Sequence, residues 1–175
     1  MQLPIRNTTT QYGFGGRILH WSSVALLLVL IFTSLEFEDL EAGSERVELI
    51  RKHASYGLIF LFIMLSRLTW RCKNINPVRS YSIKSWQKFS AFFLHRLIYA
   101  VIITQCVAGL LSLSFAGSGI PFFDFFELPA LLDKHDEFYS LSASIHFVLS
   151  IVIYPLFAIH ISAAIYHQIF GVLDD

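Results

Sequence analysis

The chain has 175 residues, of which 55% are hydrophobic and 15% aromatic, and its mean hydropathy is +0.59. This composition excludes an ordinary soluble domain of this size and favours an integral membrane protein. The 13 basic and 13 acidic residues cancel. We therefore expect no nucleic-acid partner, because nucleic-acid binding needs a basic surface.

Four apolar stretches are long enough to cross a bilayer, for which a helix needs about 20 mostly apolar residues. They cover Ile18–Leu35, Ala54–Trp70, Phe92–Phe115 and Leu141–Ile169. The first is longer than the apolar part of a signal peptide and lacks a small-residue cleavage site, so we expect a retained helix. We predict an all-α fold, an integral membrane four-helix up-and-down bundle, in which residues 1–175 form a single transmembrane domain.

Charge is distributed unevenly between the connections. The region from Arg67 to Arg96 holds seven basic residues and no acidic residue, whereas the other two connections together hold eleven acidic and four basic residues. Lys and Arg are enriched in cytoplasmic loops. We therefore predict that both termini and the 67–96 connection are cytoplasmic, and that the two acidic loops lie on the outer side.

Four histidines lie in the apolar stretches, where an ionisable side chain indicates a functional site. Up-and-down topology places His53 and His146 near the outer face, and His20 and His160 near the cytoplasmic face. The 14 residues from His146 to His160 correspond to about 21 Å along a helix. Two levels with two imidazoles each suit bis-histidine ligation of two b-type haems in a bundle core. The alternative from another class is a histidine-based membrane metal carrier.

Other residues share these faces. Arg67 follows His53 by fourteen residues and would lie near the inner level, whereas Gly57 follows His53 by one turn. Gly109 stands in the third stretch. Glycine lets a flat macrocycle approach the backbone closely, although small residues also help membrane helices pack on one another.

Two further histidines, His95 and His167, begin the third stretch and end the fourth. They are candidates for a quinone or proton site beside the inner level, since an imidazole can donate to a carbonyl and carry protons. The alternative is that both are interface residues that contact water.

The order of these landmarks resembles the prokaryotic cytochrome b561 family, small four-helix di-haem cytochromes of the bacterial inner membrane. The matching motifs are Leu19-His20-Trp21, His53-x3-Gly57-x9-Arg67, His95-Arg96-Leu97-Ile98-Tyr99, Gly109 and His146-x13-His160-x6-His167. The resemblance implies two haem b groups with His20, His53, His146 and His160 as axial ligands. It also implies electron transfer between an outer-face partner and the ubiquinone pool.

Members of this family differ in their electron donors. One branch oxidises periplasmic superoxide, and another accompanies a periplasmic lipid-binding partner and has a third loop similar to residues 119–132 of this chain. Larger relatives are cytochrome subunits of hydrogenases and dehydrogenases. A positive surface would favour capture of the superoxide anion. Only Arg46, Arg51 and Lys52 could form one beside His53, so a basic periplasmic protein or a neutral reductant fits the acidic face at least as well.

The third loop contains the aromatic run Ile120–Phe126. Aromatic residues at this density next to acids predict a segment in the outer membrane interface, either an anchor or a lid over the outer haem. Pro155 should kink the fourth helix between its two histidines.

Overall fold

Four long helices make up most of the structure, a computed structural model that describes residues 4–75, 77 and 84–170. They are α1 (Phe14–Asp39), α2 (Ser44–Lys73), α3 (Ser85–Phe115) and α4 (Asp136–Phe170). Each is long and apolar enough to span a membrane, which confirms the predicted all-α membrane bundle. Each helix contains the predicted span and extends beyond it, because the polar residues that flank the apolar stretches continue the helix.

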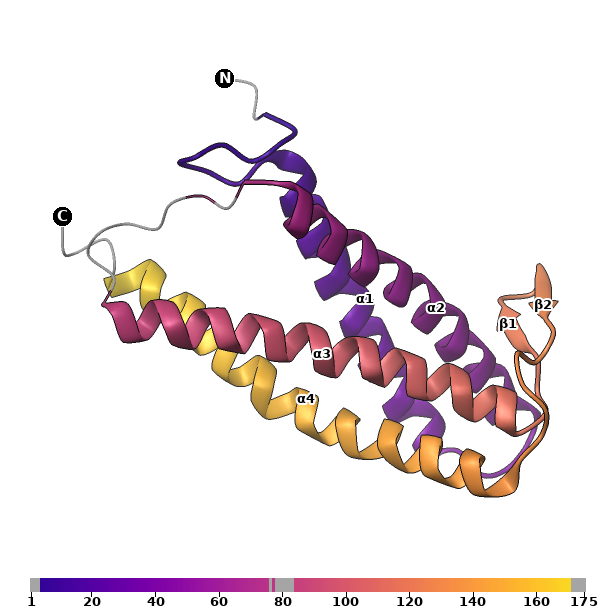
Figure 1. Cartoon of the computed structure of the whole chain (residues 1–175). Coiled ribbons are helices and arrows are strands. Elements are labelled where there is room, and N and C mark those ends of the chain that lie inside the picture. The colour runs from indigo at the N-terminus through magenta and orange to yellow at the C-terminus, as the bar shows by residue number, and fades with distance from the viewer. Residues whose placement is uncertain (1–3, 76, 78–83, 171–175) are drawn as a thin grey trace.

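The helices form two antiparallel pairs, α1 with α2 and α3 with α4, joined by contacts between α2 and α3. Figure 1 shows the pairs running close together at one end and separating toward the other. We call the first the hairpin end, where the α1–α2 and α3–α4 connections lie. The second, with the start of α1 and the end of α4, is the termini end. Within the described residues, α1 and α4 make no backbone contact.

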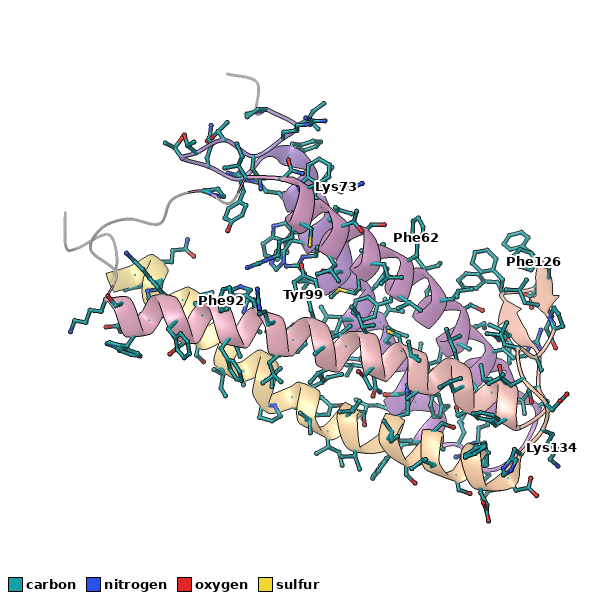
Figure 2. The ribbon with its side chains drawn as sticks, viewed as in Figure 1. Phe62, Lys73, Phe92, Tyr99, Phe126 and Lys134 are labelled. Carbon is teal, nitrogen blue, oxygen red and sulfur yellow. The ribbon has the colours of Figure 1, made fainter. Side chains whose placement is uncertain are left out.

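The apolar core is small, and most large apolar side chains face outward. One buried cluster lies where the two pairs meet and consists of Leu27, Phe60, Met64, Ile98, Val101, Ile102 and Ile153. By contrast, Phe32 is 67% and Phe62 71% exposed, and Figure 2 shows Phe62 projecting away from the bundle. Water would oppose this exposure by about 25 cal/mol for each Å² of apolar surface. The outer surface is therefore suited to a lipid bilayer.

A short β-hairpin, not predicted from the sequence, follows α3. Strands β1 (Ile120–Phe122) and β2 (Phe126–Leu128) pair antiparallel. The sequence pattern does not predict them because each strand has only three residues, too few to show the alternation that marks a strand. The fully buried Ser55 of α2 attaches the hairpin, since its Oγ accepts a hydrogen bond from the Phe123 backbone N–H at 2.7 Å and lies 3.1 Å from the Pro121 carbonyl oxygen.

Helix α4 runs without interruption through Pro155. Proline has no backbone N–H, so the carbonyl of Ile151, four residues earlier, lacks its usual intrahelical donor. The helix begins at Asp136 with acidic residues in its first turn, where they interact favourably with the helix dipole. This long helix carries His146, His160 and His167.

Candidate functional site

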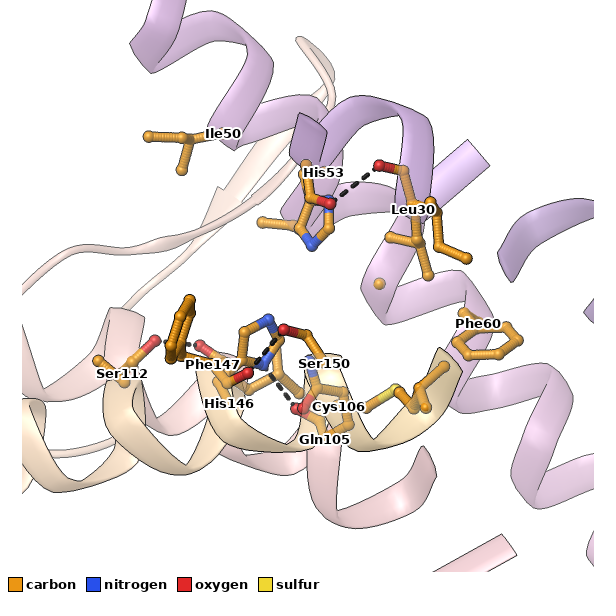
Figure 3. A pocket seen from close by; sticks show the side chains of 18 of the residues that line it. Leu30, Ile50, His53, Phe60, Gln105, Cys106, Ser112, His146, Phe147 and Ser150 are labelled. Atoms are coloured by element: carbon orange, nitrogen blue, oxygen red, sulfur yellow. Dashed lines mark hydrogen bonds between the residues drawn. The ribbon is translucent and has the colours of Figure 1, made fainter. Parts of the chain in front are cut away.

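A cavity of about 340 Å³ lies between the four helices near the hairpin end. Its wall is mostly apolar, with Leu27, Leu30 and Ile31 on one side. His53 of α2 and His146 of α4 face each other across it, as Figure 3 shows. Their ring centres are 6.3 Å apart, and the ring planes are nearly perpendicular, at 82°. The two histidines predicted at the outer level therefore lie together in one cavity.

The Nδ1 atom of His53 is fixed as a hydrogen-bond donor. It lies 3.0 Å from Thr33 Oγ1, and the Thr33 hydroxyl donates its own proton to the carbonyls of Val29 and Leu30. The hydroxyl oxygen must therefore accept from Nδ1–H. The Leu30 carbonyl, which can only accept, also bonds to the His53 ring (Figure 3). This leaves the Nε2 lone pair of His53 available to bind a metal.

His146 has the same arrangement. Its Nδ1 lies 2.9 Å from the backbone carbonyl oxygen of Gln105 on α3, and a carbonyl only accepts, so Nδ1 carries the proton. Gly109 makes room for the ring, because a Cβ atom at this position would lie 2.9 Å from Nδ1 and Cε1 of His146. Gly109, which the sequence predicts to admit a macrocycle, admits the imidazole of His146.

The residues of this cavity fit a haem held between two imidazoles. The two rings face each other with their centres 6.3 Å apart, and each has its Nδ1 atom hydrogen-bonded, so both would present Nε2 to a haem iron. Gly57 lines the same cavity, and a Cβ atom on it would meet nothing within 4 Å. The polypeptide therefore leaves open space beside His53.

The second group of histidines lies toward the termini end and is arranged differently. The His95 and His160 rings are in edge contact, with centres 5.2 Å apart, and His95 Nδ1 bonds to the Ala91 carbonyl. Arg67 Nη2 lies 2.6 Å from His20 Nδ1, and Arg67 Nη1 donates to Ser23 Oγ at 2.9 Å. Because a guanidinium only donates, His20 Nδ1 accepts and Nε2 carries the proton. Ligation of a metal through His20 Nε2 would require Arg67 to release this ring.

Three other candidate residues lie outside the cavity. Arg51 forms an ion pair with Glu127 of β2 at 2.7 Å, and Lys52 pairs with Glu48 one turn earlier in α2. His167 is seven residues beyond His160, about 10 Å closer to the termini end, and its ring contacts that of Tyr166. Arg51 and Lys52 therefore each have an acidic partner beside the cavity.

The Nδ1 partners of the two facing histidines could not be read from the sequence. Thr33 precedes His53 by twenty residues, on another helix, with no recognisable motif between them. Gln105 acts through its backbone carbonyl, which every residue possesses. For the described residues, no three His, Cys, Asp or Glu side chains come together as a metal-binding group.

The fold and the cavity define a class of protein, a four-helix membrane bundle with a cavity lined by two facing histidines from different helices. The chain belongs to the prokaryotic cytochrome b561 family, whose family model matches residues 11–174. It is similar to cytochrome b561 homolog 1 of Escherichia coli (strain K12), with 24% identity over 152 residues, which are 86% of this chain and 85% of that relative. Membership makes it a multi-pass bacterial membrane protein, a haem b cytochrome of electron transfer.

Replacing Thr33 with valine should weaken haem binding at the His53–His146 level. The change removes one acceptor from His53 Nδ1 but keeps the Leu30 carbonyl, so we expect about a tenfold loss of affinity, at the low end for residues that support a metal ligand. Titration of haem into the haem-free protein measures this. Thr104→Val, on the exposed side of α3, is the matched control, and equal affinities for both variants would contradict the assigned role of Thr33.

Proposed function

We propose that this protein is a di-haem b cytochrome that carries electrons across the bacterial inner membrane. One haem is held by His53 and His146 at the hairpin end, and the second by His20 and His160 toward the termini end. Haem iron supplies a centre that gains and loses single electrons. The observation that carries the proposal is the facing pair of imidazoles at 6.3 Å, each with Nδ1 hydrogen-bonded and Nε2 free.

The assignment of a second haem depends on the position of His160, which follows His146 by fourteen residues on the continuous helix α4. That separation is about 21 Å along the axis, so the two levels are distinct. Arg67 provides a cation at the level of His20 and His160, and in this structure it bonds to His20. Haem carries carboxylates, with which a guanidinium forms strong charge-assisted bonds. If Arg67 bonded to a haem carboxylate instead of to His20, His20 Nδ1 would be free to carry a proton. Ligation through Nε2 requires this change.

The proposed orientation places the hairpin end in the periplasm and both termini in the cytoplasm. Every acidic residue that the structure describes is in the two connections at the hairpin end or in the helix turns beside them. The termini end carries basic residues, although Arg79 of the predicted cytoplasmic connection is outside the described residues. An excess of Lys and Arg marks the cytoplasmic side. Cysteine-accessibility labelling of loop residues from each side of the membrane tests the orientation.

The electron donor proposed for the hairpin end is a basic periplasmic protein or a neutral reductant. Arg51 and Lys52 are paired with Glu127 and Glu48, and Arg46 donates to the Leu40 carbonyl. The cations nearest His53 are thus partnered, and the remaining field of this end is acidic, which disfavours approach of an anion. Stopped-flow reduction of the haems by superoxide and by basic donor proteins tests this. Faster reduction by superoxide than by every such donor would overturn the proposed donor class.

At the termini end we propose a ubiquinone site served by His95 and His167. His167→Ala should lower the rate of quinone reduction by about 10²-fold or more, the range for loss of a proton-transferring side chain, without changing haem content. Steady-state quinone reduction and the visible spectrum measure the two quantities. His135→Ala is the control, because His135 lies at the hairpin end and stacks on Phe138. Unchanged quinone kinetics in His167→Ala would contradict this role and indicate that His167 is an interface residue that contacts water.

A further inference from the structure

A second cavity, of about 570 Å³, lies on α2 at the termini end, away from the histidines. Two cations line it, Arg6 from the segment before α1 and Lys73 from the last turn of α2. Phe62 and Leu65, which are closer to the hairpin end of α2, line the other part of the cavity. Figure 2 shows Phe62 and Lys73 on the side of α2 that faces away from α3. The cavity thus opens on the outer surface of the bundle.

The segment before α1 is folded back to build this cavity. The Pro4 and Ile5 carbonyls accept hydrogen bonds from the first N–H groups of α1, at 2.9 and 3.1 Å. Asn7 joins the segment to the end of α2 by donating to the Ile75 carbonyl at 2.9 Å. Gly15 of α1 permits close packing against Trp70 of α2, since a Cβ atom on Gly15 would lie 2.8 Å from the Trp70 ring. Arg6 is therefore held beside α2.

The charge of this cavity is not balanced by the protein. Neither Arg6 nor Lys73 forms an ion pair with any residue in the described ranges, and the acidic residues of those ranges are all near the hairpin end. Two neighbouring cations without a counter-charge attract an anion, most strongly where apolar surroundings weaken screening.

The cavity changes from polar to apolar along α2. Phe62, Ser66, Thr69 and Lys73 are spaced by four, three and four residues, which places them on one face of the helix. Phe62 and Lys73 are separated by eleven steps of the helix, which correspond to about 16 Å, roughly half of a 30 Å hydrocarbon layer. From the termini end toward the hairpin end, the cavity has two cations, then two hydroxyl groups, then exposed apolar side chains. This is also the order of the phosphate, ester and acyl groups in a phospholipid.

We propose that this cavity binds the phosphate headgroup of an anionic phospholipid, with its acyl chain along Phe62 and Leu65. Arg6 and Lys73 donate to the phosphate oxygens, because Arg and Lys are the usual partners of phosphate. Basic pockets beside membrane helices bind anionic lipids in this way. The inference is independent of the proposed electron transfer, since no haem-facing residue takes part.

The test compares phosphatidylglycerol with phosphatidylcholine of the same acyl chains, added to the purified haem-containing protein in detergent. Native mass spectrometry counts the lipids that stay bound. We expect the wild type to retain phosphatidylglycerol preferentially, and the double variant R6Q/K73Q to bind it about 30-fold more weakly, from the loss of two basic residues near an anionic headgroup. The control K88Q/R96Q removes two exposed positive charges from the same end, outside the cavity, and should keep wild-type affinity.

The visible haem spectrum verifies that each variant is folded. Equal retention of the two lipids by the wild type would overturn the proposal, and so would equal losses in R6Q/K73Q and K88Q/R96Q. A further arm adds inorganic phosphate. Displacement of phosphatidylglycerol by millimolar phosphate would show a site for free phosphate and overturn the lipid assignment, whereas retention of the lipid supports it.

Discussion

Replacing His146 with alanine is expected to remove the haem at the hairpin end and to leave the second haem in place. The reason is geometric, because the ring faces His53 across a cavity that, among the described residues, no third histidine lines. His53→Ala should have the same effect, whereas His20→Ala or His160→Ala should remove the other haem. The haem-to-protein ratio and the low-temperature visible spectrum measure which one is lost. His135→Ala, at the exposed start of α4, should keep both.

Double variants sharpen this prediction. His53 and His146 serve one cofactor in our assignment, so the variant lacking both should contain as much haem as either single variant. The variant lacking His53 and His160 should contain none. This non-additive pattern follows from residues that act as a unit. Loss of both haems from a folded single variant would contradict the division into two levels.

Gly109→Ala and Gly57→Ala should both weaken haem binding, but for different reasons. Gly109 gives room to the His146 ring, whereas Gly57 is expected to give room to the haem. A Cβ atom at Gly109 would lie 2.9 Å from the His146 ring, so the ring must shift and its bond to the Gln105 carbonyl is strained. We expect the affinity for the hairpin-end haem to fall about 100-fold, the upper range for loss of support to a metal ligand. Haem titration of the haem-free variant measures the loss.

A Cβ atom at Gly57 meets no protein atom within 4 Å. Alanine in a helix is favoured over glycine by up to about 1 kcal/mol, so haem-free Gly57→Ala should melt at the same temperature as the wild type or higher. Haem binding should nevertheless weaken, because the methyl group enters space that the macrocycle uses. Normal haem affinity in Gly57→Ala would show that the bound cofactor does not reach this glycine.

Several features were predictable because they follow from composition and helical spacing. The four membrane helices follow from apolar length, and the pairing of His53 with His146 in one cavity follows from topology. The contact between Arg67 and His20 was not predicted, although the depth of Arg67 was, because depth is a property of one helix and contact depends on how two helices pack. For the same reason, spacing did not indicate that His95 lies against His160.

Local charge could be predicted only in part from sequence order. The sequence shows that Arg51 and Lys52 could form a positive surface beside His53, whereas the structure shows that each has its own acidic partner. The partner of Lys52 is four residues away and could have been anticipated from helical spacing. The partner of Arg51 is on β2, and this pairing depends on a hairpin whose three-residue strands are too short to be predicted from the sequence pattern.

The separation of α1 from α4 has a consequence for assembly. The two helix pairs meet through α2 and α3, while the facing histidines belong to α2 and α4. A cofactor bound to both rings would therefore act as a cross-link between two membrane hairpins that share only a small apolar interface. Because ligand binding stabilises the folded state by mass action, the resistance of this bundle to heat and detergent should increase with its haem content. The cofactor would then be a structural part of the protein core as well as its redox centre.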